Sequence, residues 1–233
     1  MAEVFVREFR TADRAAVRRI CFETGSMGDP IAWQYADEAS FADMLSAYYT
    51  DAEPEGAWVA ELDGKVVGYM LSCLDSRKAW KPSEIALRHA LTRQLWVRPG
   101  TASFYWRGAL DMGVDFLRGS RRPNFDEQRY PSHTHNNLTP EGRGQGIAKE
   151  FFYRVFDRAK LAGSPGLHGG IWSENKAMLK FAMNLGYRPE GKPHPAPGLR
   201  YPDGHRVSVQ LMLRDLDDWE PGAWRSWTSA YRA

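Results

Sequence analysis

Small residues crowd the segment Glu141-Gly142-Arg143-Gly144-Gln145-Gly146-Ile147-Ala148, which joins a strand pattern, Ser132 to Leu138, to a helical pattern, Ile147 to Leu161. The first backbone N–H groups of a helix have no acceptor within the helix, and the helix dipole favours negative charge there. Glycines let an anion approach this backbone, and Arg143 can add a charge-assisted hydrogen bond. The segment therefore predicts a phosphate-binding loop, with a glycine-rich surface turn as the alternative.

Two other nucleotide-binding motifs do not fit the chain. A P-loop requires GxxxxGK[ST], and no glycine here is followed by Lys and then Ser or Thr. A Rossmann fingerprint requires GxGxxG after an early strand, and Gly142, Gly144 and Gly146 are spaced wrongly for it. A nucleotide-binding protein of another class remains an alternative, and NADPH or ATP would stabilise it.

The strongest local signal lies upstream of the loop. Two strand patterns, Ala57 to Leu62 and Lys65 to Leu74, are joined by Asp63-Gly64, a dipeptide that favours a type I′ turn, so a hairpin is expected. Downstream of the loop, a strand at Leu167 to Trp172 is followed by Ser173, which is expected to cap a helix. A strand, loop, helix, strand and helix in this order normally build a parallel pair with a right-handed crossover.

The remaining patterns predict one α/β domain over residues 1–233, without an internal repeat or a linker. An aromatic-rich insertion with helical spacing occupies residues 75–129, and a tail occupies residues 215–233. A Pro-rich bend is expected from Pro189 to Pro202, before a last strand at Val207 to Leu213. The other expected elements are a strand at Val4–Phe9, a helix capped by Thr11, a helix at Glu38–Tyr49, and insertion helices at Glu84–Leu95 and Ser103–Leu117.

The composition bounds the function of the 233-residue chain. Its hydrophobic content of 43% is enough for a packed core, and its net charge of +2 comes from interspersed residues of both signs. A nucleic-acid or anionic-membrane partner is therefore not expected. No stretch has the roughly eighteen apolar residues of a membrane span, and the first residues lack the apolar core of a signal peptide. Cys21 and Cys73 have no metal-ligand spacing, so buried thiols in a cytoplasmic protein are expected.

The pattern Arg143-x-x-Gly146-x-Ala148 resembles the R/Q-x-x-G-x-G/A signature of the GNAT superfamily of N-acetyltransferases. The order of the expected elements is similar to that of the family over about two-thirds of the chain, and Leu185-Gly186-Tyr187 stands where the family has a Leu-Gly-aromatic turn. The resemblance implies a mixed, mostly antiparallel central sheet flanked by helices, with the insertion between the third and fourth strands.

A narrower resemblance precedes the loop. The run Tyr130-Pro131-Ser132-His133-Thr134-His135 is similar to the acetyltransferase-like domain of O-GlcNAcases and its bacterial relatives. Such relatives often have Asp where this chain has Asn137, so an acid role at that position does not carry over.

The GNAT resemblance also implies acetyl-CoA as the cofactor. Backbone groups around Leu138 and Thr139 would hold the pantetheine and the thioester, and Asn175 and Phe181 would line the other side of the cofactor. The pyrophosphate would lie on Arg143, Gly144, Gln145, Gly146, Ile147 and Ala148.

The reaction implied by this resemblance is attack of an amine on a thioester. A base removes a proton from an amine whose pKa is about 10.4, and an acid can protonate a thiolate whose pKa is about 8.5. His133, His135 and Asn137 share one strand face by the period of two, and a histidine suits the role of the base. The alternative is that either histidine only satisfies buried backbone groups. His-x-His also suggests zinc, but no third ligand clusters with it, so no metal is expected.

The acid of the family does not carry over to this chain. Many members have Tyr after the residue that aligns with Phe181, whereas this chain has Ala182. Tyr153 or Tyr187 could substitute, the thiolate could leave unprotonated, or the chain could bind acyl-CoA without turnover. The sequence predicts an acetyl-CoA-dependent N-acetyltransferase for a small-molecule or peptide amine, with a non-catalytic acyl-CoA-binding module as the alternative. The aromatic residues of the insertion are expected in the core or in a homodimer contact.

Overall fold

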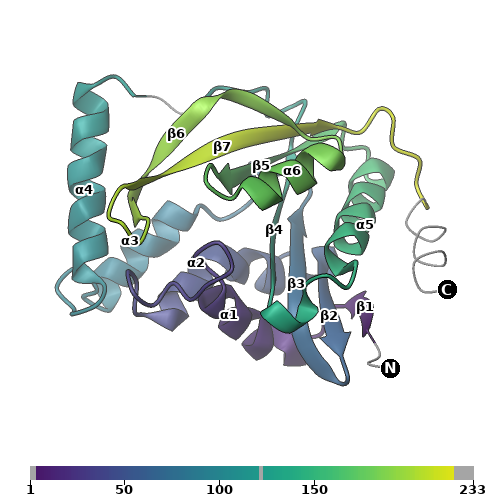
Figure 1. The fold of residues 1–233 in the computed structure, drawn as a ribbon, viewed down its shortest axis with the longest axis horizontal. Helices are drawn as coiled ribbons and strands as arrows, with labels where there is room; N and C mark the ends of the chain where they lie inside the picture. Colours follow the sequence, from purple (N-terminus) through teal and green to yellow (C-terminus); the bar gives the residue numbers. More distant parts are fainter. Residues whose placement is uncertain (1–3, 121–122, 223–233) are drawn as a thin grey trace.

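Seven strands form one mixed sheet in the order β1-β2-β3-β4-β5-β7-β6, in a computed structural model that describes residues 4–120 and 123–222 (Figure 1). The strands are β1 (Val4–Glu8), β2 (Ala57–Leu62), β3 (Lys65–Cys73), β4 (Ser132–Leu138), β5 (Gly166–Trp172), β6 (Arg188–Arg200) and β7 (Arg206–Asp215). The helices are α1 (Arg14–Glu23), α2 (Glu38–Asp51), α3 (Pro82–Thr92), α4 (Ala102–Leu117), α5 (Ile147–Leu161) and α6 (Lys176–Asn184). Short 3-10 turns occupy Thr11–Asp13, Pro54–Gly56 and Pro140–Gly142. Neighbouring strands are antiparallel except for β4 and β5, which confirms the expected architecture.

Helices α1 and α2 cover one face of the first half of the sheet. The periodicity of α1 buries Val17, Ile20 and Cys21 as one stripe. This stripe packs with Tyr69 and Leu71 of β3 in a buried cluster. Each large apolar side chain that is fully buried contributes roughly 1.5–3 kcal/mol to stability. The cluster therefore fixes α1, and the loop that follows it, against β3 and β4.

Helices α5 and α6 cover the opposite face of the sheet. Phe151 and Phe156 of α5 are buried with Met70 of β3 in a second cluster. Successive residues of β3 therefore point into opposite clusters, as the period of a strand requires. Trp219, beyond the last strand, packs on Phe156 with 5.1 Å between ring centroids, and its indole N–H donates to Asp157 at 2.8 Å. The part of the tail that precedes residue 223 thus packs on α5.

The insertion of residues 75–129 contains α3 and α4. Helix α4 begins one residue earlier than the sequence predicts and ends at the expected residue, Leu117. It stands at the end of the molecule opposite α5 and packs on β6 (Figure 1). Within the described residues, no helix combines the length and the apolar content that a membrane crossing needs.

The expectation of a bend from Pro189 to Pro202 is wrong, because most of this region forms the strand β6. Proline has no backbone N–H to donate, but β6 lies at the edge of the sheet, where only one side of the strand is paired. Its register with β7 shifts between Glu190 and His194 and again between Pro195 and Arg200. An irregular edge ladder therefore accommodates a proline-rich strand.

The cap of α6 also differs from the expectation. The side chain of Asn175, rather than that of Ser173, accepts the N–H of Met178 at 3.0 Å. The predicted hairpin is confirmed, because Asp63 and Gly64 have φ values of 49° and 79°, as a type I′ turn requires.

Candidate functional site

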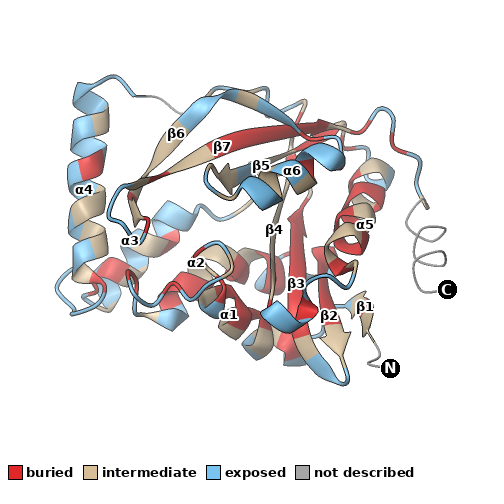
Figure 2. Cartoon of the chain, viewed as in Figure 1, coloured by how far each residue is buried: buried red, intermediate tan, exposed pale blue. Residues whose placement is uncertain are grey.

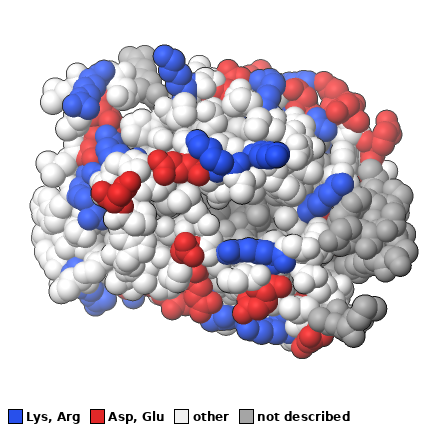
Figure 3. Space-filling view, viewed as in Figure 1, with Lys and Arg blue, Asp and Glu red and all other residues white. Residues whose placement is uncertain are grey.

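Strands β4 and β5 separate partway along their length. Their parallel register pairs only Ser132 with Leu167 and His133 with His168, although both strands continue for several residues. A cavity of about 750 Å³ opens between them, lined by residues 134–138 of β4 and 169–172 of β5. Figure 3 shows it as a hollow in the middle of the face in view. Its volume lies within the range of about 300–1,000 Å³ that is common for ligand sites.

One end of the cavity is formed by the loop between β4 and α5. Gly144 and Gly146 have φ values of 75° and 74°, which glycine adopts without a Cβ clash. Gly146 is the N-cap of α5, and Ile147, Ala148 and Lys149 of the first helical turn line the cavity, so the positive end of the helix dipole lies beside it. A Cβ added to Gly144 would meet no atom within 4 Å, so the loop has open space above it. These features fit an anion.

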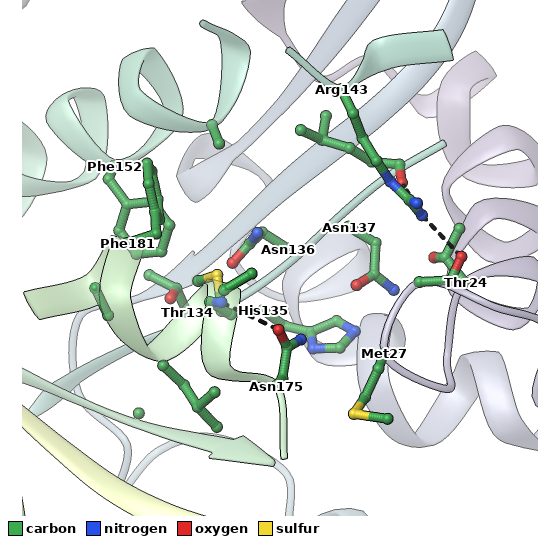
Figure 4. A pocket seen from close by; sticks show the side chains of 18 of the residues that line it. Thr24, Met27, Thr134, His135, Asn136, Asn137, Arg143, Phe152, Asn175 and Phe181 are labelled. Atoms are coloured by element: carbon green, nitrogen blue, oxygen red, sulfur yellow. Dashed lines mark hydrogen bonds between the residues drawn. The ribbon is translucent and has the colours of Figure 1, made fainter. Parts of the chain in front are cut away.

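Arg143 extends across the mouth of the cavity. Its Nη2 donates to the carbonyl oxygen of Gly28 at 2.8 Å and to that of Leu138 at 3.4 Å. Figure 4 shows the guanidinium directed at the loop that follows α1. A Cβ on Gly28 would lie 2.6 Å from the same Nη2, so a side chain at this position would displace the guanidinium. Both partners are neutral carbonyl groups, so neither of them neutralises the charge of Arg143.

Helices α5 and α6 form the wall on the other side of β4. Asn175 and Phe181 both line the cavity, and the ring of Phe181 lies 5.8 Å from that of Phe152. Because the carboxamide oxygen of Asn175 accepts from Met178, its NH₂ group is the part that can donate to a ligand. Ala182 also lines the cavity and is buried.

His135 and Asn137 lie on the face of β4 that is directed at α1 and α2. Both line the cavity, and Figure 4 shows them on the side of Thr24 and Met27. Their strand partners, Leu71 and Tyr69, belong to the cluster beneath α1. The structure therefore brings two of the three predicted catalytic residues to the cavity.

The ring of His135 lies beside a tyrosine hydroxyl and a cysteine thiol. Its Nε2 lies 3.1 Å from the hydroxyl of Tyr69 and 3.8 Å from the thiol of Cys21. Burial lowers the pKa of His135 to about 4, so the ring is neutral at pH 7. Burial also raises the pKa of Cys21 to about 12 and that of Tyr69 well above its usual range. Nδ1 of His135 forms no hydrogen bond with the described residues, so it is the nitrogen that can meet a ligand.

His133 shares the strand face but does not line the cavity. Its Nε2 lies 2.6 Å from the hydroxyl of Tyr49, and its Nδ1 lies 2.8 Å from that of Ser76. Burial and the neighbouring ring of His168 lower its pKa to about 4. Both ring nitrogens of His133 therefore contact side-chain hydroxyls inside the protein, and not the buried backbone groups that the alternative role requires.

Two of the predicted cofactor-binding residues also lie off the cavity. The N–H of Thr139 donates to the carbonyl of Val67 at 2.9 Å as an extension of the sheet, and Gln145 is exposed on the loop. The other predicted residues that line the cavity are Leu138, Arg143, Gly144, Gly146, Ile147, Ala148, Asn175 and Phe181.

The two tyrosines considered as acids differ in position. Tyr187 lines the cavity, but its ring packs 6.1 Å from that of Phe152 and 6.0 Å from that of Phe156. Burial raises the pKa of Tyr187 above its usual range. Tyr153 packs on Trp219 with 4.9 Å between ring centroids and does not line the cavity. Tyr187 is buried against two phenylalanine rings and Tyr153 lies off the cavity, so neither is placed as a general acid would be.

The loop between α1 and α2 contributes a wall that no motif in the sequence marks. Thr24, Gly25, Met27 and Gly28 line the cavity together with Leu45 of α2. These residues lie far from β4 in the sequence, and the packing of α1 on β3 brings them to it. The only signal that could have found them is the apolar stripe that docks α1 on the sheet.

Charge on the cavity wall is of one sign. Among the described residues, Arg143 and Lys149 line it, and no aspartate or glutamate does. The described part of the chain also contains no group of three or more His, Cys, Asp or Glu side chains that could hold a metal ion.

No family model matches the chain, but solved structures share its fold. SsHAT is 22% identical, with a TM-score of 0.62 over 93% of this chain and 100% of its own. The yncA protein of Salmonella typhimurium, solved with its cofactor acetyl-CoA, is 20% identical, with a TM-score of 0.55 over 94% and 98% of the two chains. A GNAT superfamily phosphinothricin acetyltransferase from Sinorhizobium meliloti, in complex with acetyl-CoA, is 17% identical, with a TM-score of 0.57 over 94% and 91%. The chain therefore has the fold of the GNAT superfamily, as the motif that begins at Arg143 predicts.

Proposed function

We propose that this protein is an acetyl-CoA-dependent N-acetyltransferase. The observation that carries the proposal is the separation of β4 and β5 above an anion-binding loop. An extended arm with amide groups can lie along the separated strand edges while its phosphates rest on the N-terminus of α5. The two acetyl-CoA complexes of this fold support the choice of ligand. When bound, acetyl-CoA supplies an acetyl group that is activated as a thioester.

The residues of the cavity fit this cofactor. Arg143, Gly144 and Gly146 suit a diphosphate, because a cation and the positive end of the α5 dipole converge there. The NH₂ group of Asn175 suits an amide of the pantetheine arm. On β5, a Cβ added to Gly169 would meet no atom within 4 Å, so the arm can approach the bare strand backbone.

His135 is the residue that we assign as the proton acceptor. Its low pKa keeps it neutral, and the hydroxyl of Tyr69 holds Nε2, so that Nδ1 can face the amine. A histidine with a pKa of about 4 is a weak base. It is sufficient because the amine nitrogen becomes much more acidic as it bonds to carbon. Asn137, on the same strand face, orients the amine through its carboxamide.

Ala182 leaves α6 without a hydroxyl where many GNAT enzymes have a tyrosine. A thiol with a pKa of about 8.5 leaves readily near neutral pH, so the loss of an acid slows turnover without abolishing it. The same alanine also favours a second candidate function, a non-catalytic acyl-CoA-binding module. The two functions differ in turnover and not in cofactor affinity.

The positive charge of the cavity wall limits which amines can act as the acetyl acceptor. Without a carboxylate among the described lining residues, the site does not stabilise an ammonium group or a second positive charge. At pH 7.5 about one lysine-like amine in 800 is neutral, whereas roughly a third of α-amino groups are. The acceptor is therefore a small molecule or peptide with an amine of low pKa, such as an α-amino group, and with no further cationic group.

Thiol release from acetyl-CoA with a panel of amines tests this proposal. His135→Gln should lower kcat by roughly 10²- to 10⁴-fold while leaving the thermal shift caused by acetyl-CoA unchanged. His133→Gln is the matched control from the same strand face, and it should retain most of the turnover. Acetyl-CoA binding without turnover of any amine would favour the non-catalytic module. No thermal shift at millimolar acetyl-CoA would exclude both functions.

A further inference from the structure

Helix α4 turns its charged side to the protein. Asp111 accepts from Arg200 at 2.7 and 2.9 Å and from the N–H of Gly198 at 2.9 Å, and Asp115 accepts from Arg206 at 2.9 and 2.8 Å. Burial opposes the ionisation of Asp111, but the hydrogen bonds from Arg200 and Gly198 outweigh it and lower the pKa. The side of α4 that packs on β6 and β7 is therefore ionic.

The opposite side of α4 is apolar and exposed. Trp106, Leu110, Phe116 and Leu117 are 57%, 69%, 85% and 83% exposed. Pale blue alternates with tan along α4 in Figure 2, and the same end of the molecule carries many uncharged side chains in Figure 3. A surface helix normally directs its apolar stripe at the core. In this structure the stripe, which we call the α4 apolar face, is largely exposed to solvent, and the ring of Trp96 covers part of it. It consists of Trp106, Leu110, Gly113, Phe116 and Leu117.

We propose that the α4 apolar face is a homodimer interface that packs against the same face of a second copy of this chain. Trp106, Leu110, Gly113 and Leu117 recur at i, i+4, i+7 and i+11, which is the spacing of a helix–helix seam. A Cβ added to Gly113 would meet no atom within 4 Å, so a partner helix can approach closely near the middle of the seam. The partner that fits is an apolar helix, and a two-fold axis supplies one from the second copy.

The size of the exposed surface agrees with a dimer. Each exposed tryptophan or phenylalanine side chain offers roughly 100 Å² or more, and Trp96 extends the face, since the rings of Trp96 and Trp106 lie 6.4 Å apart. Trp96, Trp106, Leu110, Phe116 and Leu117 together offer on the order of 500 Å² per copy, which is more than half of the roughly 800 Å² that each partner contributes to a standard interface.

The charges of α4 favour a second copy over a membrane. Its ionised side chains are Arg107, Asp111 and Asp115, all partly or fully buried on the inner side, so two copies bring no like charges together. A helix that binds an anionic lipid surface carries several Lys and Arg residues on its polar face, whereas α4 carries one arginine and two aspartates.

Sedimentation velocity of the full chain from 1 to 100 µM tests this proposal, and it requires neither cofactor nor activity. The wild type should sediment as a dimer, and Leu110→Glu should sediment as a monomer with an unchanged far-UV circular dichroism spectrum, because Leu110 is exposed in the protomer. Leu161→Glu is the matched control, since Leu161 is 75% exposed on α5 and outside the α4 apolar face; it should remain dimeric.

A wild type that stays monomeric at 100 µM would overturn the proposal. So would a Leu110→Glu variant that sediments as the wild type does, because the interface would then lie elsewhere. Flotation of the wild type with vesicles that contain phosphatidylserine, lost in Leu110→Glu, would replace the second copy with a lipid surface.

Discussion

Replacement of Gly144 by aspartate places a carboxylate in the anion loop. Gly144 has a φ of 75°, so a side chain there costs roughly 1–2 kcal/mol of stability. The added Cβ meets no atom within 4 Å, and a negative charge near the N-terminus of α5 recovers about 0.3–1 kcal/mol. The net loss is about 1 kcal/mol, which lowers Tm by about 2–4 °C in a chain of this size. The variant is therefore expected to fold.

The effect on cofactor binding is larger. Two phosphate charges about 5 Å from the new carboxylate, at an effective dielectric constant of about 40, cost roughly 3 kcal/mol, which is more than 100-fold in Kd. Acetyl-CoA at 100 times the wild-type Kd stabilises the wild type by about 2.7 kcal/mol, or roughly 5–11 °C in Tm. At the same concentration a variant with 100-fold weaker affinity gains only about 0.4 kcal/mol, or roughly 1–2 °C.

Thermal denaturation with and without acetyl-CoA measures the difference, and Gly163→Asp is the control. Gly163 lies just beyond the other end of α5, with a φ of 79° and no atom within 4 Å of an added Cβ. Its substitution carries the same backbone cost, and it should keep the full wild-type shift. Equal ligand shifts in the two aspartate variants would refute the placement of the phosphates on the loop.

Two further changes test the chemistry of the site and its buried histidines. Ala182→Tyr introduces the tyrosine hydroxyl that many GNAT enzymes have at this position, and it should raise kcat by roughly 10-fold at pH 6.5. The increase should be small at pH 9, where the thiolate leaves without an acid. Equal thiol-release rates for the variant and the wild type at pH 6.5 would count against a missing acid. Because burial lowers the pKa of His133 and His135 to about 4, the unfolded chain binds more protons than the folded chain between pH 4 and pH 6.5. Stability should therefore fall by about 1.5 kcal/mol per histidine from pH 6.5 to pH 5. Urea unfolding of the wild type and of His133→Gln measures this, and identical pH slopes would contradict a neutral buried His133.

Elements whose signals are local were predictable from the sequence. The Asp63-Gly64 turn and the glycines at 144 and 146 are constrained by their own backbone dihedral angles, and the structure shows the positive φ values that these residues tolerate. The same holds for α5, whose bounds follow from a glycine before it and an apolar stripe along it. The phosphate loop is the part of the candidate site that such local rules reach.

The roles within β4 depend on what packs against the strand. Strand periodicity places His133 and His135 on one face, and their β3 partners, Cys73 and Leu71, belong to a single cluster. Tyr49 and Ser76 then close on the first histidine, while the second lines the cavity. The sequence pattern does not distinguish the two positions, because the closing side chains come from distant segments.

Long-range contacts also determine that the proline-rich segment forms the edge strand β6, and which side of α4 faces the protein. The prolines of β6 favour a bend, and only its place beside β7 makes it a strand. The apolar stripe of α4 predicts burial, but the ion pairs of Asp111 with Arg200 and of Asp115 with Arg206 turn that stripe outward.

The sequence by itself determined the anion loop, the hairpin and the order of the elements, because these follow from dihedral preferences and short periodicities. The tertiary structure decided the separation of β4 and β5, the histidine that lines the cavity and the exposed face of α4, because these depend on segments that meet only when the chain is folded.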